Sequence, residues 1–567
     1  MMNNIDNKKM QKVHKNPALK WIFGVSEKLK YQLLLLVLLN SLISVSVVMF
    51  AVVLKDTVDA AVTGAKIAFF RYVFLLGVLV FVQIAFKAVI RRMDEYVRAD
   101  MENRLKCRTY KTILSRKYDS ITSFHTGELL NRMTNDVVVV ADGFAQIIPG
   151  IIAMLVKMLG AAVVLFLLDY RFAVIYSAGG AVLLMFTAMF RKVMKRLHKD
   201  VQAADGVVRS HLQENLGSLM VLKTFGVENK SLLASEEYME KHKQVRMKKN
   251  MFSNLCNIGF GLVMNGGYLF GLVWCGCGIL FGNITLGTLS AVLQLVDQLQ
   301  QPFANITGYL PKFYGMLSSA ERLMELEALD EEIIEDKKDK VFCYEFYRSM
   351  ERLVCDKIDF AYEGNQVFKN AEFTIDKGEF VAVMGSSGAG KSTLLKLLLA
   401  MYMPDSGQLY FEGAGNQYPV TDSYRGMFAY VPQGNFLMSG TIRDAIVFLD
   451  DNGSNIDIER VYNAAHIACV DTFAEKLEKG YDTVIGERGL GISEGQAQRI
   501  AIARALYTDA PVLLFDEATS ALDESTEKQV LKNIRELTDK TLIIVTHRKA
   551  VLELCDRCVV LEDKHFE

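Results

Sequence analysis

The run from Gly385 to Thr393 carries the clearest chemistry in this sequence. It reads GSSGAGKST and matches the pattern G-x-x-x-x-G-K-[ST] of a phosphate-binding loop. In such a loop the backbone N–H groups and the start of the following helix bind phosphate oxygens. Lys391 would reach the β- and γ-phosphates and stabilise the charge that develops during hydrolysis, and the Ser392 hydroxyl would bind Mg²⁺. We therefore predict contacts to ATP from Gly385, Ser386, Ser387, Gly388, Ala389, Gly390, Lys391, Ser392 and Thr393.

The segments around this loop decide between a phosphate site and a glycine turn that binds no ligand. Residues 379–384 form an apolar run that favours a buried strand, and residues 394–399 favour the start of a helix. The motif requires this strand–loop–helix order. A second apolar run, at 512–517, ends in Asp516 and Glu517. We expect Asp516 to act on Mg²⁺, directly or through water, and Glu517 to be the general base or to position the attacking water.

Five further motifs accompany the loop and the two carboxylates, in the order found in the ATPases of ABC transporters, which this chain resembles. The resemblance implies that Tyr362 stacks on adenine, and that Gln433 binds Mg²⁺ and senses the membrane domain. It also implies that His547 contacts the γ-phosphate and holds the closed catalytic geometry. The other two motifs are I-S-E-G-Q at 492–496 and S-A-L-D at 520–523.

The resemblance also implies that the chain works as one half of a pair. In the family, the residues that match Ser493, Gly495 and Gln496 bind the ATP held by the opposite subunit. The segment that ends at Asp523 crosses the dimer interface and contributes to the same site. Whether the partner is a second copy or a different half-transporter stays open. Glu494 stands where glycine is usual in this motif, and we expect its side chain to point away from the phosphate.

The first half of the chain is more apolar than the second. Of the 567 residues 51% are hydrophobic, and the formal net charge of −1 gives no indication of a nucleic-acid partner. Nine cysteines without framework spacing predict no disulfides. Six apolar segments are each near the roughly 20 residues needed to span a bilayer. We place these spans at Leu33–Leu54, Ile67–Ile90, Ile147–Leu168, Phe172–Phe190, Ile258–Phe281 and Leu286–Ile306.

The connections between the spans differ in length and charge. Those at 91–146 and 191–257 are long and rich in lysine and arginine, and the others are short. Since positive charge stays on the cytoplasmic side, both termini and both long loops are expected to lie inside the cell. The long loops also have helical patterns, so we expect them to continue the spans as stalks. This predicts a multi-pass protein of the plasma membrane, in which residues 1–30 include a helix on the membrane surface.

Charged and polar residues inside the spans are candidates for a substrate cavity. Lys157 and Asp297 lie at similar depths, roughly 18 Å below the outer surface at about 1.5 Å per residue. They either line a water-accessible cavity, pair directly with each other, or each find a separate partner among the helices. Gln294, Gln298 and Gln301 recur at helical spacing and predict an inward polar stripe.

The sequence therefore predicts a multidomain protein with an all-α transmembrane domain of six long helices at 31–319, a charged linker at 320–340 and an α/β phosphate-loop ATPase domain of the ABC type at 341–567. Three segments are similar to the exporter-type group: the coupling regions at 124–130 and 214–226, and G-E-R-G at 486–489. We predict ATP-driven export, or flipping to the outer leaflet, of an amphipathic small molecule, lipid or peptide by alternating access in a dimer. Two alternatives stay open: an uptake transporter of the same fold, and a membrane subunit whose ATP sites gate a partner.

Overall fold

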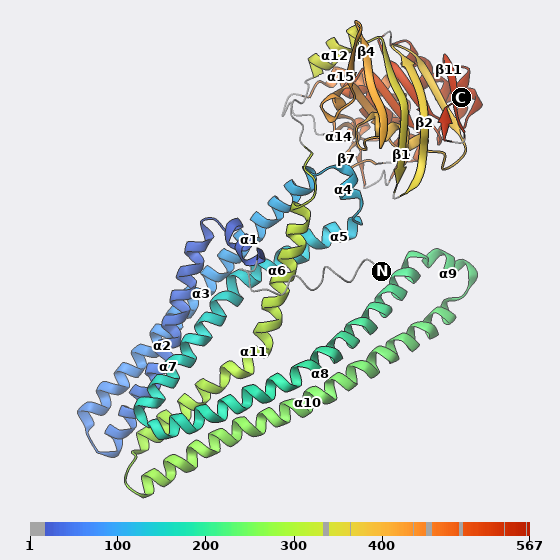
Figure 1. Ribbon diagram of the computed structural model, residues 1–567. Coiled ribbons are helices and arrows are strands. Elements are labelled where there is room, and N and C mark those ends of the chain that lie inside the picture. Colours follow the sequence, from blue (N-terminus) through green and yellow to red (C-terminus); the bar gives the residue numbers. More distant parts are fainter. Residues whose placement is uncertain are drawn as a thin grey trace. The chain divides into compact units, whose positions relative to one another are not determined.

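The chain forms two compact units, one helical and one with sheets (Figure 1). The first unit combines Met1–Ile113 with Thr126–Ala328, and the second combines Leu114–His125 with Leu329–Glu567. This confirms the predicted fold class of a helical domain followed by an α/β domain. The computed structural model describes residues 17–332, 340–362, 364–434, 436–448, 456–486, 491–537, 539–562 and 564–566.

Six long helical stretches build the described part of the first unit. They are α2 (Leu29–Val62), α3 (Lys66–Leu114), the stretch of α5 (Thr126–Asn131), η2 (Arg132–Asp136), α6 (Val137–Asp142), η3 (Gly143–Ile147) and α7 (Ile148–Leu168), then α8 (Tyr170–Gly217), α10 (Glu228–Leu280) and α11 (Leu286–Glu327). Helices form here because a helix satisfies its backbone hydrogen bonds internally, as lipid requires. The long charged connections are helical over most of their length, as predicted. α2, α7 and α11 pack together, and α8 runs along α10 (Figure 1).

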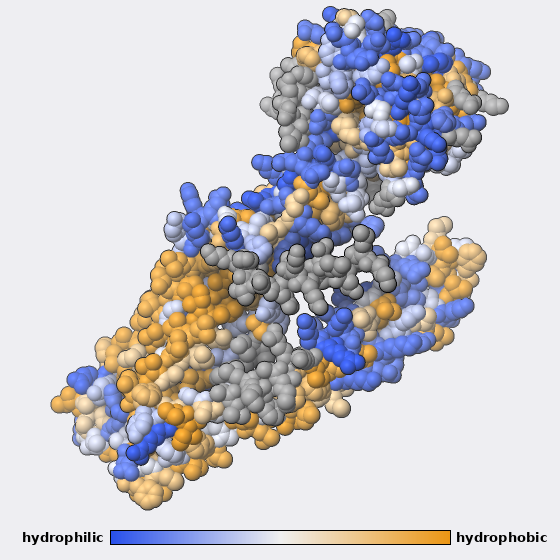
Figure 2. Space-filling view, viewed as in Figure 1, coloured by the Kyte–Doolittle hydropathy of each residue, from blue (hydrophilic) through white to orange (hydrophobic). Residues whose placement is uncertain are grey.

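The apolar parts of these helices lie on the surface of the first unit. By length and composition, four stretches of the described chain can cross a membrane: Leu29–Val62, Lys66–Leu114, Thr126–Leu168 and Glu228–Leu280. Figure 2 shows broad orange, hydrophobic surface along the helices of this unit. An apolar surface of this extent is favourable against lipid and unfavourable against water. α8 and α11 contain side chains outside the described residues, so their two spans stay predictions.

Two buried charges on the helical stretch before α7, Asp136 and Arg132, pair with residues of α11. Asp136 is 0% exposed and accepts hydrogen bonds from Ser319 Oγ at 2.9 Å and from Arg322 Nε at 2.7 Å. Arg132 is also buried, and its guanidinium lies 2.9 Å from a carboxylate oxygen of Glu325. Buried charges are tolerated only where each has a partner. These pairs therefore fix the two helices in one arrangement.

The second unit has two main sheets. Its strands are β1 (Arg352–Tyr362), β2 (Asn365–Asp376), β3 (Phe380–Gly385), β4 (Ser406–Gly413), β5 (Asn416–Pro419), β6 (Phe428–Val431), β7 (Gly440–Thr441), β8 (Val484–Ile485), β9 (Val512–Asp516), β10 (Thr541–Val545), β11 (Arg557–Glu562) and β12 (His565–Phe566). The larger sheet has the order β12-β11-β3-β10-β9-β6, with the five strands from β11 to β6 parallel. The smaller sheet is antiparallel, in the order β2-β1-β4-β5.

Helices cover the larger sheet and complete two apolar cores. Successive residues of β9 alternate between them: Leu513 and Phe515 belong to one core and Leu514 to the other. This alternation follows from the period of two in a strand, and it explains why β9 is buried along its whole length. In its described part, the helices of this unit are α4 (Tyr118–Thr122), α12 (Lys340–Ser349), α13 (Lys391–Leu398), η4 (Asp422–Met427), α14 (Ile442–Val447), α15 (Ile458–Ile467), α16 (Asp471–Ala474), η5 (Gly480–Asp482), α17 (Glu494–Thr508), α18 (Glu524–Arg535) and α19 (Lys549–Leu552).

The structure differs from the predicted domain limits in two places. α11 continues to Glu327, so the predicted linker starts too early at residue 320. At the end of this helix the Glu327 carboxylate accepts a hydrogen bond from Trp21 Nε1 at 2.9 Å, which connects the end of α11 to the N-terminal part of the chain. The segment Leu114–His125, predicted within the transmembrane domain, groups with the second unit instead. Residues 1–16, 333–339 and 487–489 lie outside the described residues, and of the predicted surface segment the structure describes α1 (Pro17–Val25).

Candidate functional site

Four of the predicted motifs leave the same edge of the larger sheet. β3, β10, β9 and β6 are parallel neighbours, so their carboxyl ends lie side by side. The phosphate-binding loop follows β3, and His547 follows β10. Asp516 ends β9 and is followed by Glu517, and Gln433 comes shortly after β6. Ligands of open parallel sheets bind at this edge, so the fold collects these four motifs in one place.

The phosphate-binding loop has a backbone that glycine adopts most easily. Gly385 and Gly390 have φ angles of 151° and 111°. A Cβ on Gly390 would also lie 2.4 Å from Val367 Cγ1. Lys391 is 6% exposed, and its Nζ donates to the carbonyl oxygens of Gly385 and Ser386 at 2.9 and 2.8 Å. The ammonium group is therefore held within the loop, beside the predicted place of the β- and γ-phosphates. The remaining predicted loop residues form the turn between β3 and α13 (Ser387, Gly388, Ala389) or the first turn of α13 (Ser392, Thr393).

Asp516 lies beside Ser392 at the start of α13. Its carboxylate is 2% exposed, and it accepts hydrogen bonds from Ser392 Oγ at 3.0 Å and from Tyr430 Oη at 3.2 Å. Burial raises the pKa of Asp516 above its usual value, and these two hydrogen bonds oppose the rise. Mg²⁺ prefers hydroxyl, carboxylate and phosphate oxygens as ligands. The oxygen atoms of Ser392 and Asp516 therefore fit a magnesium ion that is bound together with phosphate.

Glu517 lies between a glutamine and a histidine. Gln433 Nε2 donates to Glu517 Oε2 at 2.9 Å, and His547 Nε2 lies 3.8 Å from Glu517 Oε1. Glu517 has a φ of 50°, which is unfavourable for a residue with a side chain and recurs at functional sites. Its backbone N–H donates to Val545 O at 3.1 Å, which holds this conformation. The carboxylate is thus placed to orient a water molecule and to accept its proton.

Tyr362, the residue predicted to stack on adenine, ends β1 close to the phosphate-binding loop. Its side chain hydrogen bonds Thr393, and burial raises the pKa of its hydroxyl. The ring packs edge-on against Phe360, with 4.8 Å between ring centroids, and against Tyr402, with 5.2 Å. Other aromatic rings therefore hold Tyr362 in position beside the loop.

The I-S-E-G-Q motif begins α17 and borders a pocket of its own. Ser493 and Gln496 cap this helix reciprocally: Ser493 Oγ accepts from Gln496 N at 3.3 Å, and Gln496 Oε1 accepts from Ser493 N at 2.9 Å. A Cβ on Gly495 would lie 2.8 Å from Ala521 O, so this position needs glycine for close packing. The described residues that line the pocket include none from the phosphate-binding loop; they are Ser493, Glu494, Gly495, Arg499, Ala521, Leu522, Asp523 and Thr526.

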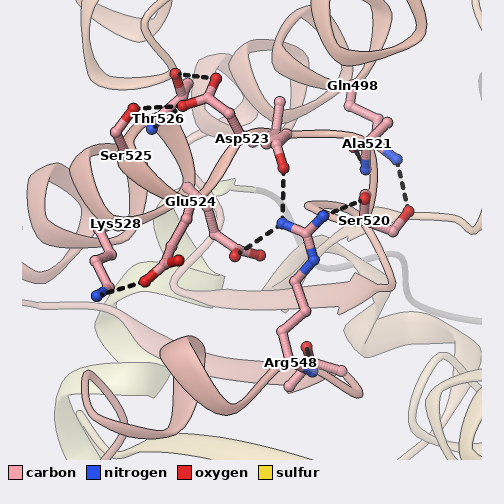
Figure 3. Close-up of polar contacts among 12 residues, drawn as sticks. Gln498, Ser520, Ala521, Asp523, Glu524, Ser525, Thr526, Lys528 and Arg548 are labelled. Carbon is pink, nitrogen blue, oxygen red and sulfur yellow. Dashed lines mark hydrogen bonds and ion pairs between the residues drawn. The ribbon is translucent and has the colours of Figure 1, made fainter.

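Arg548, which the sequence analysis did not single out, holds the S-A-L-D segment (Figure 3). Its guanidinium donates to Ser520 O at 2.6 Å and to Leu522 O at 2.7 Å. It also donates to Glu527 Oε2 at 3.0 Å, and Glu527 is 1% exposed. Because Arg548 is next to His547 in the chain, the S-A-L-D segment and His547 are held together. The spacing of residues in the sequence could not have predicted these contacts of Arg548, because they depend on how β10 and α18 pack.

Asp523, predicted to contact ATP, caps α18 (Figure 3). Its carboxylate accepts from Thr526 N at 2.9 Å and from Thr526 Oγ1 at 2.8 Å. Hydrogen bonds from Ser525 and Thr526 hold the pKa of Asp523 well below its usual value. On the other side of the segment, Gln498 of α17 accepts from Ala521 N at 2.9 Å. Within this subunit the Asp523 carboxylate thus positions the segment that precedes α18.

Three of the predicted cavity residues form a hydrogen-bonded chain between α7 and α11. Lys157 Nζ donates to Gln301 Oε1 at 2.6 Å, and Gln301 Nε2 donates to Asp297 Oδ2 at 2.9 Å. Gln301 therefore bridges the two charges that the sequence analysis considered as a direct pair. Asp297 and Gln301 are exposed, and Lys157 is half-buried. This arrangement leaves polar atoms accessible within the predicted spans.

The other two glutamines are less exposed than Gln301. Gln298 is 3% exposed and donates to Val47 O of α2 at 3.1 Å, which corrects its assignment to the cavity. Gln294 is half-buried, one turn before Gln298. Gln300, not chosen from the sequence, donates to Tyr176 Oη at 2.8 Å. Helical spacing placed the glutamines near one face of α11 but did not show which helix covers each part of it.

Two family models match the chain. The model for the ABC transporter transmembrane region matches residues 32–303, and the ABC transporter model matches residues 368–520. Apart from residues 114–125, the first match lies in the helical unit, and the second runs from β2 through the phosphate-binding loop to the S-A-L-D segment. The two regions are thus fused in one chain.

Curated relatives and a solved structure extend over most of the chain. An ATP-dependent lipid A-core flippase of Desulfotalea psychrophila (strain LSv54 / DSM 12343) is 26% identical over 551 residues, which cover 93% of this chain and 94% of the flippase. A flippase of the same description from Vibrio vulnificus (strain YJ016) is 29% identical over 442 residues, 77% of this chain and 74% of its own. A bacterial Atm1-family ABC exporter with ATP bound is 24% identical with a TM-score of 0.79, covering 96% of this chain and 94% of that chain. That likeness shows the fold.

Proposed function

Because the chain belongs to the ABC transporter family, we propose that it is one half of an ATP-driven exporter that moves an amphipathic substrate across or between the leaflets of a membrane. The observation that best supports this is the contact of Glu517 with Gln433 and His547 beside the phosphate-binding loop. This hydrolytic arrangement is fused to helices with exposed apolar surface. The flippases named above are relatives over most of the chain.

The described residues can supply each part of ATP hydrolysis. Catalysis of phosphoryl transfer needs stabilised charge on the γ-phosphate and an oriented water molecule. Lys391 and the loop N–H groups would bind the phosphates. Ser392, Gln433 and Asp516 would hold Mg²⁺, which supplies positive charge when bound. Glu517 would orient the water and accept its proton, and its contacts to Gln433 and His547 would keep the carboxylate in place.

The exporter fold of a half-transporter implies a dimer. We propose that each I-S-E-G-Q pocket receives the ATP held by the other subunit, since the described lining of that pocket has no residue from its own phosphate-binding loop. α9 (Leu219–Phe225) also supports a second subunit. It lies in the predicted coupling region, and its apolar residues Met220 and Phe225 are 83% and 74% exposed. Both termini and the stalks would lie in the cytoplasm.

The hydrogen-bonded series of Lys157, Gln301 and Asp297 supports an amphipathic substrate. An ammonium and a carboxylate that remain accessible between apolar helices would bind a polar or charged headgroup, while the helix surfaces accept acyl chains. The named relatives act on lipid A-core, which is amphipathic in the same sense. We therefore propose a lipid with a charged headgroup as the substrate class.

Lys157→Leu is expected to lower lipid transport about 10-fold while basal ATP hydrolysis stays within about 2-fold, because it removes one charged hydrogen bond to the substrate and none in the ATPase unit. The measurement is ATP-dependent movement of a fluorescent anionic lipid in vesicles that contain the purified dimer. Leu159→Ala is the control, since Leu159 lies on the same helix and is 62% exposed. Normal transport by Lys157→Leu would contradict the role of this residue.

The same vesicles test the proposed function and its alternatives. An exporter or flippase should hydrolyse ATP steadily and move the labelled lipid away from the leaflet that faces the ATPase units. An uptake transporter would move its substrate toward that side. A gating subunit would bind ATP without steady turnover or lipid movement, and this outcome would overturn the proposal.

A further inference from the structure

Tyr402 contacts two parts of the second unit that are far apart in the sequence. It lies in the loop after α13 and is half-buried. On one side its ring centroid is 5.2 Å from that of Tyr362, with the ring planes at 87°. On the other side it is 5.8 Å from that of Tyr118, with the planes at 90°. Its hydroxyl also lies 3.3 Å from Thr122 Oγ1, so Tyr402 contacts both ends of α4 (Tyr118–Thr122).

α4 belongs to the segment that joins α3 to α5. The start of this segment is attached to the second unit by backbone hydrogen bonds: Lys117 N donates to Asp330 O at 3.1 Å, and Glu332 N donates to Ser115 O at 2.9 Å. These bonds hold the residues before α4. The contacts of α4 itself with the ATPase fold include those to Tyr402. The position of α4 therefore depends on the Tyr402 ring, and the chain continues from α4 directly into helices of the first unit.

Tyr362 gives Tyr402 a direct connection to the ATP site. Aromatic pairs at right angles have a preferred geometry, so fixing one ring restricts its neighbour. In the structure Tyr362 hydrogen bonds Thr393 of the phosphate-binding loop. An adenine base stacked on Tyr362 would restrict that ring, and through Tyr402 it would restrict Tyr118 as well.

On the basis of the proposed ATPase function, we propose that Tyr402 is a positioning residue that transmits the presence of the adenine base from Tyr362 to α4. In this arrangement the base and α4 stabilise each other, since two sites coupled through one element affect each other equally. Gln433 and Glu517 respond to the phosphate end of the nucleotide. Tyr402 responds to the base, and it acts on a different element of the chain.

Hydrogen exchange of the 118–125 segment in the full dimer measures this coupling. In a Glu517→Gln background, which holds ATP without turnover, saturating ATP is expected to slow exchange in this segment about 5-fold or more. Tyr402→Ala should remove this slowing and leave the Kd for ATP within about 3-fold, whereas Tyr402→Phe should keep it because the ring contacts remain. Tyr362→Ala should also abolish the slowing of hydrogen exchange in the 118–125 segment, when measured at ATP concentrations that restore occupancy of the site.

Two further variants make the result decisive. Tyr418→Ala is the matched control, because Tyr418 is 36% exposed and its ring packs at a right angle on Phe346 of α12, 5.1 Å away. In this variant ATP should still slow hydrogen exchange in the 118–125 segment. Tyr118→Ala removes the other partner of Tyr402 at a position that is 41% exposed, and it should lose the slowing even if Tyr402→Ala folds poorly. If Tyr118→Ala keeps the full effect of ATP on the segment, the proposal is overturned.

Transport measurements separate this inference from the proposed function. With Glu517 intact, Tyr402→Ala is expected to raise the ATP consumed per lipid moved about 5-fold. Vesicles of the unmodified dimer that move no lipid would overturn the exporter assignment and leave the exchange result standing. Normal ATP consumption per lipid in Tyr402→Ala, together with normal slowing by ATP, would overturn the role of Tyr402 and leave the exporter assignment standing.

Discussion

Glu517→Gln is expected to lower the rate of ATP hydrolysis at least about 100-fold and to leave ATP binding within about 3-fold of the unmodified protein. Glutamine has the same length as glutamate and can still pair with Gln433, whose Nε2 now donates to Glu517 at 2.9 Å. It cannot accept a proton from the attacking water. The contacts that hold the phosphates, from Lys391 and the loop N–H groups, are not changed. Binding and turnover should therefore separate.

The measurements are phosphate release by the purified dimer and titration with a fluorescent ATP analogue. Glu536→Gln is the control, since Glu536 is an exposed glutamate at the end of α18. It should hydrolyse ATP at the normal rate. Undiminished hydrolysis by Glu517→Gln would remove Glu517 from the catalytic role and leave the site without a base.

Asp136→Ala is expected to destabilise the helical unit by about 2 kcal/mol, because it removes a buried carboxylate that accepts hydrogen bonds from Ser319 and Arg322 and leaves a buried hydroxyl without this acceptor. Asp136 is 0% exposed, and both Ser319 and Arg322 donate to its carboxylate. The alanine variant would leave the buried Ser319 hydroxyl without this acceptor, whereas the Arg322 side chain is 44% exposed and can turn to water. The connection between α11 and the stretch before α7 should weaken.

The unfolding midpoint of the solubilised dimer measures this loss. Asp142→Ala is the matched control on the same helical stretch, because Asp142 is 43% exposed and its ion pair with Arg98, at 3.3 Å, lies at the surface. Such a pair contributes less than about 1 kcal/mol. An equal loss of stability in both variants would show that burial of Asp136 has no special importance.

The ATP site was predictable because its motifs are local. The glycines at Gly385 and Gly390 are required by the backbone of one loop, and Ser493 and Gln496 cap the helix that they begin. Each of these features depends on residues a few positions apart, which a sequence displays directly. Four of the apolar spans were predictable for a similar reason, since an apolar run of sufficient length becomes a helix in lipid.

The contacts between distant residues were not predictable in this way. Gln298 was assigned to a cavity from its helical spacing, but it donates to Val47 O of α2. The direct pairing of Lys157 with Asp297 that the sequence allowed is replaced by a bridge through Gln301. Spacing along one helix shows that residues share a face. It does not show which neighbouring helix covers them.

By itself, the sequence determined the order of the motifs, the phosphate-binding loop, the place of Glu517 at the end of an apolar strand and the long helices, because each follows from short-range backbone geometry or from the hydropathy of one run. The tertiary structure decided what those parts touch: Arg548 on the S-A-L-D segment, Arg322 on Asp136, and Tyr402 between Tyr362 and α4. These contacts join residues that no local rule relates, since they arise only when separate elements pack and each buried charge or ring must find a partner.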